Sequence, residues 1–181
     1  MIYKYNELLG KYKNRYQITK ALENDELFKI EGGYYSNKNN PSEMEIINKK
    51  YREAIYTMDS AFYMHDLTDV IPTKHHLAIN RKSRKISNPN VKTYFTSESF
   101  FGVGKSKMEM DNGLIVNIYD KERMLIELIR NKNKLPYDFY KDIINNYRDI
   151  IDTIEIRKIE EYLKYFKNRE NIYKIIRNEV F

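Results

Sequence analysis

The sequence predicts an α+β protein in which a small N-terminal module precedes a mixed sheet with C-terminal helices packed on it. Apolar residues recur at helical spacing from Lys121 to the C-terminus. Short apolar or alternating runs, which are typical of strands, occupy the middle of the chain. A polar segment at Asn39-Asn40-Pro41 separates the module from the rest, so we expect domains of 1–40 and 41–181.

The composition narrows the possible functions. The 181 residues include no cysteine, which excludes disulfides, thiolate zinc sites and cysteine nucleophiles. Lys and Arg number 32 against 26 Asp and Glu, and the formal charge of +6 favours a polyanionic partner. The N-terminus lacks a secretory signal pattern, and no apolar run reaches the roughly 18 residues of a membrane helix. We therefore expect a cytoplasmic protein that has no membrane partner.

The N-terminal module has the order helix, basic turn, helix, hairpin. A first helix is predicted by apolar residues at helical spacing that end at a glycine: Ile2, Tyr5, Leu8, Leu9 and Gly10. Asn14 can cap a second helix, whose apolar positions are Tyr16, Ile18, Ala21 and Leu22. Leu27 to Glu31 reads as a strand, Gly32-Gly33 as a tight turn and Tyr34-Tyr35 as the return strand. This is the order of a winged helix-turn-helix that lacks its usual first helix.

The same module carries our candidate DNA contacts. Between Lys11 and Lys20 there are four Lys or Arg residues and no acid. Cations neutralise phosphates, whereas Asn, Gln and Thr side chains can bond to base edges. The residues expected to contact DNA are Lys11, Lys13, Asn14, Arg15, Gln17, Thr19, Lys20 and, on the hairpin, Lys29. The alternative is that these charges form only a solvated helix face.

The second domain should begin with a helix, because Ser42 and Glu45 form a capping-box pattern. Ala54-Ile55-Tyr56 then predicts a buried strand. Thr57 and Asp59 can cap a short helix that runs to about Leu67. Further strands are expected at 76–79, 91–96, 107–110 and 114–119, the last two joined by a hairpin turn at Asp111-Asn112-Gly113. Four amphipathic helices follow Lys121.

A second basic segment lies in the loop from Asn80 to Pro89, which we interpret as a solvated hairpin loop. From Thr73 to Ser97 the chain has six Lys or Arg residues and no acid. This possible second basic surface consists of Arg81, Lys82, Arg84 and Lys85. It could face phosphates or meet an acidic protein partner.

The sequence offers little reason to expect catalysis. Gly102 to Ser106 ends like a phosphate-binding P-loop, but Ser99 stands where the pattern needs glycine and a strand follows instead of a helix. His75 and His76 would point to opposite faces of a strand, so they cannot share a metal ion. His65 has acidic neighbours, yet a surface or capping role is simpler. We predict no catalytic, cofactor-binding or metal-binding residues, and no enzyme activity.

Three segments together resemble the AbiEi family, the antitoxin half of the AbiE abortive-infection systems. Ser60 to Pro72 resembles the family's Ser-Ala-Leu segment and its short helix ending in Gly-Leu-Thr-Asp and a Pro, with Asp66 at the glycine position. Ile118 to Leu128 resembles its strand-to-helix passage Ser-Pro-Glu-Arg-Thr-Leu-Leu-Asp. Leu27 to Tyr35 is similar to the wing that ends in Arg-Gly-Val-Tyr.

This resemblance implies a function in a type IV toxin–antitoxin system of phage defence. Such proteins repress their own operon at inverted repeats in the promoter, through a winged helix-turn-helix. Their C-terminal antitoxin domain counters a nucleotidyltransferase-type toxin, the AbiEii partner. An alternative is an antitoxin that holds its toxin by direct contact and binds DNA weakly. A third possibility, an enzyme acting on nucleotides or nucleic acid, rests only on the incomplete P-loop and scattered carboxylates.

Overall fold

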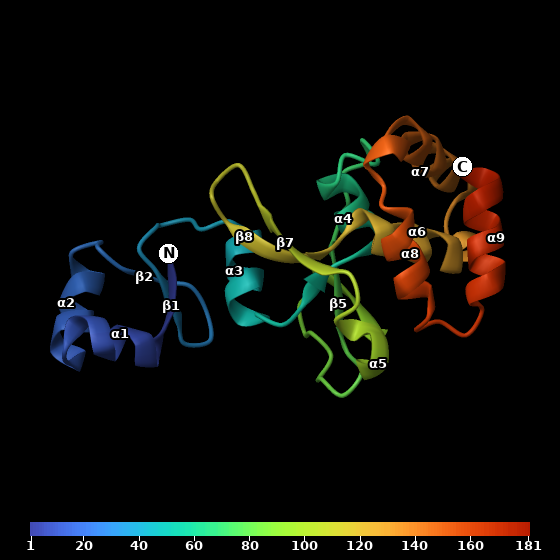
Figure 1. Ribbon diagram of the computed structural model, residues 1–181. Coiled ribbons are helices and arrows are strands. Elements are labelled where there is room, and N and C mark those ends of the chain that lie inside the picture. Colours follow the sequence, from blue (N-terminus) through green and yellow to red (C-terminus); the bar gives the residue numbers. More distant parts are fainter. The chain divides into compact units, whose positions relative to one another are not determined.

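The computed structural model describes residues 1–181, which form two compact units, Met1–Arg52 and Glu53–Phe181. Both units combine helices with a β-sheet, so the predicted α+β class is confirmed. Figure 1 labels most of their helices and several of their strands. None of the helices has the combined length and apolar character needed to cross a membrane.

The first unit is a three-stranded antiparallel sheet with three helices. Its elements in order are β1 (Ile2–Lys4), α1 (Tyr5–Tyr12), α2 (Arg15–Glu23), β2 (Phe28–Lys29), β3 (Tyr34–Ser36) and α3 (Glu43–Lys50). The strands lie in the order β1-β3-β2, so the first strand pairs with the last. Gly32 and Gly33 both have positive φ, at 49° and 81°, which explains the two glycines in this hairpin.

The start of the chain differs from the prediction. Ile2 belongs to a strand and not to the first helix, because it pairs with Ser36 and is buried against the sheet. Helix α1 also continues through Gly10 to Tyr12, and Lys13 ends it with a φ of 62°. The cap of the second helix is confirmed, since the Asn14 side chain accepts a hydrogen bond from the Gln17 N–H at 2.9 Å.

Helix α3 belongs to the first unit, so the unit ends at Arg52 and not at residue 40. Two ion pairs tie its last turn to earlier elements: Lys49 Nζ lies 2.7 Å from Glu7, and Lys50 Nζ lies 2.9 Å from Glu31. Ser42 and Glu45 form the predicted capping box at its start. A polar linker in the sequence is therefore a loop within this unit.

The second unit is built on a mixed five-stranded sheet in the order β6-β5-β4-β8-β7. Its strands are β4 (Ile55–Tyr56), β5 (His75–Asn80), β6 (Val91–Thr96), β7 (Lys105–Glu109) and β8 (Ile115–Tyr119). The hairpin between β7 and β8 is confirmed. The predicted hairpin between β5 and β6 is wrong, because these strands run parallel. The basic loop between them must therefore run from the end of β5 back to the start of β6.

The helices of this unit are α4 (Met58–Met64), α5 (Glu98–Phe101), α6 (Lys121–Arg130), α7 (Tyr137–Asp149), α8 (Ile156–Leu163) and α9 (Arg169–Glu179), with 3₁₀ turns η1 (Lys132–Lys134) and η2 (Ile151–Thr153). The last four α-helices match the prediction, whereas α4 stops three residues before Leu67. Thr57 occupies the N-cap of α4, but its hydroxyl donates to Met124 Sδ and does not cap the helix. Helix α6 packs against α4, α8 and α9 (Figure 1) and is buried from Glu122 to Ile129.

Candidate nucleic-acid interface

Seven of the eight predicted DNA contacts lie on α1, α2 and the two-residue turn between these helices. Leu8 of α1 packs with Ile18 and Ala21 of α2 and with Leu27, and this small core fixes the two helices against each other. All seven predicted residues are exposed. Lys29, the eighth, is exposed on β2 in the same unit.

Three of these residues already have partners within the chain. Lys11 Nζ donates to the Tyr3 hydroxyl at 3.3 Å, and this bond raises the pKa of Lys11. The Asn14 side chain caps α2, and the Thr19 hydroxyl donates to the Arg15 carbonyl at 3.2 Å. To read a base, Asn14 would have to give up its hydrogen bond to the Gln17 N–H. Thr19 would have to give up its hydrogen bond to the Arg15 carbonyl of the same helix.

The other cations at this surface form no ion pair. Lys13, Arg15, Lys20 and Lys29 are exposed and lie beyond salt-bridge distance of any acid in the structure. Met1–Arg52 contains ten Lys and Arg residues and seven Asp and Glu residues. Five of these seven acids lie outside α1 and α2. The turn and the first part of α2 therefore present uncompensated positive charge, which suits a phosphate backbone.

Tyr16 is the residue at this surface that sequence reasoning misplaced. The sequence pattern predicts that Tyr16 belongs to the apolar stripe of the second helix, but its side chain is 75% exposed, the most of any large hydrophobic residue in the chain. Ile18 and Ala21 form the buried face, and Tyr16 lies two positions before Ile18, almost on the opposite side of the helix. Helical geometry applied to the sequence could have revealed this position.

The second basic surface, Arg81, Lys82, Arg84 and Lys85, is exposed in the loop that links parallel strands β5 and β6. Buried Ile86 anchors the loop. The Asn80 side chain accepts a hydrogen bond from the Lys82 N–H, and the Asn88 side chain accepts one from the Asn90 N–H. Lys82 is paired with Glu98. The structure thus holds Arg81, Arg84 and Lys85 as free cations on an ordered loop.

The glycine-rich segment from Gly102 to Ser106 surrounds a buried arginine and not a phosphate site. Arg123 of α6 is 0% exposed, and its Nη1 donates to the carbonyls of Phe100 and Val103 at 2.9 and 3.0 Å. A P-loop instead points N–H groups at an anion. Gly104 is required here because its φ is 73° and an added Cβ would lie 2.4 Å from Arg123 Cβ.

Arg123 is held by an acid and by aromatic rings. Its Nε and Nη2 donate to Glu127 Oε1 at 3.1 and 2.8 Å, and its guanidinium lies over the rings of Phe100, Tyr119 and Phe166. Burial raises the pKa of Tyr119 to about 12, so this ring stays neutral. The arrangement is a closed structural centre in the interior of the second unit.

The histidines do not converge on a common site. His65 is buried, its Nε2 lies 2.7 Å from the Tyr119 carbonyl, and burial lowers its pKa. His75 contacts the ring of Tyr56, whereas His76 contacts Tyr94. No group of three or more His, Cys, Asp or Glu residues is placed to hold a metal ion.

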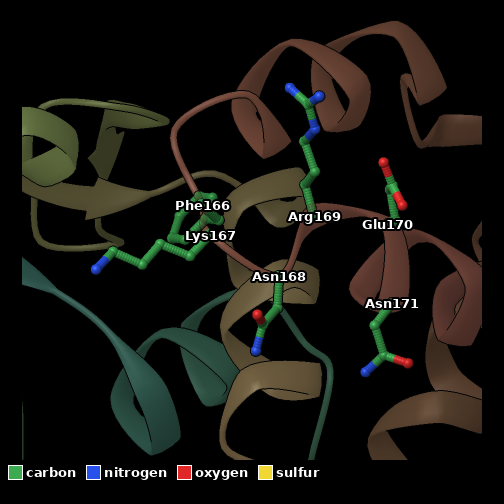
Figure 2. Close-up of a pocket in the computed structure, with 6 residues that line it drawn as sticks. All are labelled: Phe166, Lys167, Asn168, Arg169, Glu170 and Asn171. Atoms are coloured by element: carbon green, nitrogen blue, oxygen red, sulfur yellow. The ribbon is translucent and has the colours of Figure 1, made fainter.

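An open pocket of about 550 Å³ lies at the joint between α8 and α9, lined by residues 166–171. Figure 2 shows that Lys167, Arg169 and Glu170 extend in different directions from this joint. A ligand in the pocket would therefore meet no set of converging polar groups. Comparison with protein-family models finds no matching family, and comparison with curated protein sequences finds no matching relative.

Proposed function

We propose that the protein is an AbiEi-like antitoxin whose first unit is a reduced winged helix-turn-helix that binds operator DNA. In this proposal the protein represses its own operon at inverted repeats in the promoter and counters a nucleotidyltransferase-type toxin. The observation that supports this proposal most strongly is exposed, uncompensated positive charge: Lys13 lies in the two-residue turn between two packed helices, and Arg15 and Lys20 lie on the second helix. The strand order β1-β3-β2, with a glycine hairpin after the second helix, supports the same reading.

The resemblance to the antitoxin family gains support from backbone geometry. Asp66, which stands at the family's glycine position, has a φ of 58°, a conformation that glycine adopts without cost and aspartate tolerates. In the second resembling segment Asp120 falls on the family's serine, and it caps α6 by accepting the Arg123 N–H at 2.8 Å. Arg123 and Glu127 fall on its arginine and final aspartate, and they pair at 2.8 Å.

A gel shift of the full chain on a duplex from its own promoter tests DNA binding. We expect Arg15→Ala combined with Lys20→Ala to weaken binding and to reduce the slope of log affinity against log salt by about two, because two phosphate contacts are lost. The matched control is Lys164→Ala with Arg177→Ala, which removes two exposed cations from the second unit. Equal affinity and slope for the test pair and the control pair would rule out this DNA-binding assignment.

A second candidate, neutralisation of the toxin by direct contact, is favoured by an apolar projection on the second unit. Val70 and Ile71 are 56% and 71% exposed. Their loop is held in place, because the Thr68 hydroxyl accepts the Val70 N–H and Asn146 donates to the Leu67 carbonyl. Co-expression with the toxin encoded beside this gene tests the idea: a stoichiometric complex that Ile71→Asp disrupts supports it, and separate elution of the two unaltered proteins contradicts it.

A further inference from the structure

The outward face of α2 carries two side chains that are not phosphate binders. Tyr16 and Glu23 lie seven residues apart, two turns of the same helix, so they project in nearly the same direction. Ile18 and Ala21 occupy the opposite, buried face. Neither the Tyr16 hydroxyl nor the Glu23 carboxylate has a hydrogen-bond partner in the structure, and both residues are exposed.

We propose that Tyr16 and Glu23 are the residues with which α2 reads base edges in the major groove of duplex DNA, while Lys13, Arg15 and Lys20 contact phosphates. This inference rests on the proposed function and specifies how the same surface chooses its sequence. Uncompensated cations on the turn and along α2, including Lys20 between Tyr16 and Glu23 on the outward face, argue for a polyanionic occupant. Glu23 is the last residue of α2, and its carboxylate repels phosphates, so Glu23 favours DNA only where it faces a base donor.

The chemistry of the two side chains predicts what they prefer. A tyrosine ring offers apolar surface that suits the methyl group of thymine, and a glutamate accepts a hydrogen bond from the amino group of cytosine. Seven residues of α-helix rise about 10.5 Å, which matches about three base-pair steps of 3.4 Å. The expected preference is therefore a thymine and a cytosine separated by about three base-pair steps.

The hydrogen bonds of the predicted readers strengthen this assignment. The Asn14 side chain accepts a hydrogen bond from the Gln17 N–H, and the Thr19 hydroxyl donates one to the Arg15 carbonyl. Both side chains would therefore lose an internal hydrogen bond on reaching a base. Tyr16 and Glu23 give up none. Gln17 lies about 100° around the helix from Tyr16 and can reach only the edge of the same groove.

Selection from a random duplex library, with the full chain and with Tyr16→Ala, Tyr16→Phe and Glu23→Gln, tests the proposal. For the unaltered protein we expect a motif containing the spaced thymine and cytosine. Replacing that thymine by uracil, which removes only the methyl group, should weaken binding about three- to tenfold for the unaltered protein and for Tyr16→Phe, but not for Tyr16→Ala. Glu23→Gln should relax the preference for cytosine alone.

The outcomes distinguish sequence-specific DNA binding by the protein from base reading by Tyr16 and Glu23. If the unaltered protein selects no motif, both this inference and operator recognition fail. If it selects a motif that Tyr16→Ala and Glu23→Gln leave unchanged, with the same uracil penalty, then α2 binds DNA but these residues do not read it. Circular dichroism of each variant confirms folding, which we expect to be unaffected because both side chains are exposed.

Discussion

Helices α2 and α6 begin alike, yet their first-turn arginines have opposite surroundings. Asn14 caps α2 through the Gln17 N–H at 2.9 Å, and Asp120 caps α6 through the Arg123 N–H at 2.8 Å. Arg15 is exposed and forms no ion pair, whereas Arg123 is completely buried. Local rules thus start both helices, and tertiary surroundings decide whether the arginine of the first turn is exposed or buried.

The surroundings of Arg123 explain how a charge can be buried. A buried ion costs several kcal/mol unless its charge and its donors are matched. Arg123 has a carboxylate, two carbonyls and three aromatic rings around it, and Glu127 also accepts from Arg130 at 2.7 Å. Arg15 has no comparable partners, so its charge remains available to an external anion.

The largest expected effect comes from Arg123→Ala. It leaves the carbonyls of Phe100 and Val103 without their donor and opens a cavity between three rings, so we expect a loss of about 3–5 kcal/mol in unfolding free energy. Hydrogen exchange of the α6 amides in the full chain measures this loss for the second unit. A loss below about 1 kcal/mol would show that Arg123 is not the centre of this unit.

The next effect concerns the glycine that accommodates Arg123. Gly104→Ala combines a positive φ with a clash against Arg123 Cβ, and we expect it to cost about 2–4 kcal/mol. Gly113→Ala is the matched control: its φ is 75°, but nothing lies within 4 Å of the added Cβ, so only the backbone cost of about 1–2 kcal/mol should remain. Equal losses for the two variants, measured by chemical denaturation, would contradict close packing at Gly104.

Most of the fold could be predicted from the sequence because it follows local rules. The caps at Asn14 and Ser42, the turns at Gly32-Gly33 and Asn112-Gly113 and the C-terminal helices all have short-range signals. Parallel pairing of β5 with β6 has no such signal, since it is decided by distant residues. In the same way, nothing in the sequence distinguishes Arg123 from an exposed helix residue. Its contacts with the rings of Phe100, Tyr119 and Phe166 form only in the folded unit.

The candidate site was predictable in position but not in its details. A run of cations around a helix turn is visible in the sequence, and the structure places these cations on exposed surface. Hydrogen bonds formed by Lys11, Asn14 and Thr19 depend on folded geometry, and they change which residues remain free. Tyr16 was misassigned because an aromatic residue in a helical pattern usually belongs to the core.

A smaller effect is expected from pH, and it should be confined to the second unit. Burial lowers the pKa of His65, whose Nε2 lies 2.7 Å from the Tyr119 carbonyl, so the folded state takes up a proton on this ring at a lower pH than the unfolded chain does. The unfolded state gains a proton near pH 6.5, and therefore the unfolding free energy should fall as the pH drops below that value. His65→Gln should reduce this slope between pH 7 and pH 5 in denaturation curves, and an unchanged slope would exclude His65 as its source.

Arg15→Ala should have the smallest effect on stability, at most about 0.5 kcal/mol, because the side chain is exposed and forms no ion pair. Asn14→Ala in the same turn should cost about 1 kcal/mol, since α2 loses the acceptor for the Gln17 N–H. Thermal denaturation of the two variants separates a structural residue of the turn from one that is free to bind. A larger loss for Arg15→Ala than for Asn14→Ala would mean that Arg15, like Arg123, has a structural role, and its place among the phosphate contacts would then have to be given up.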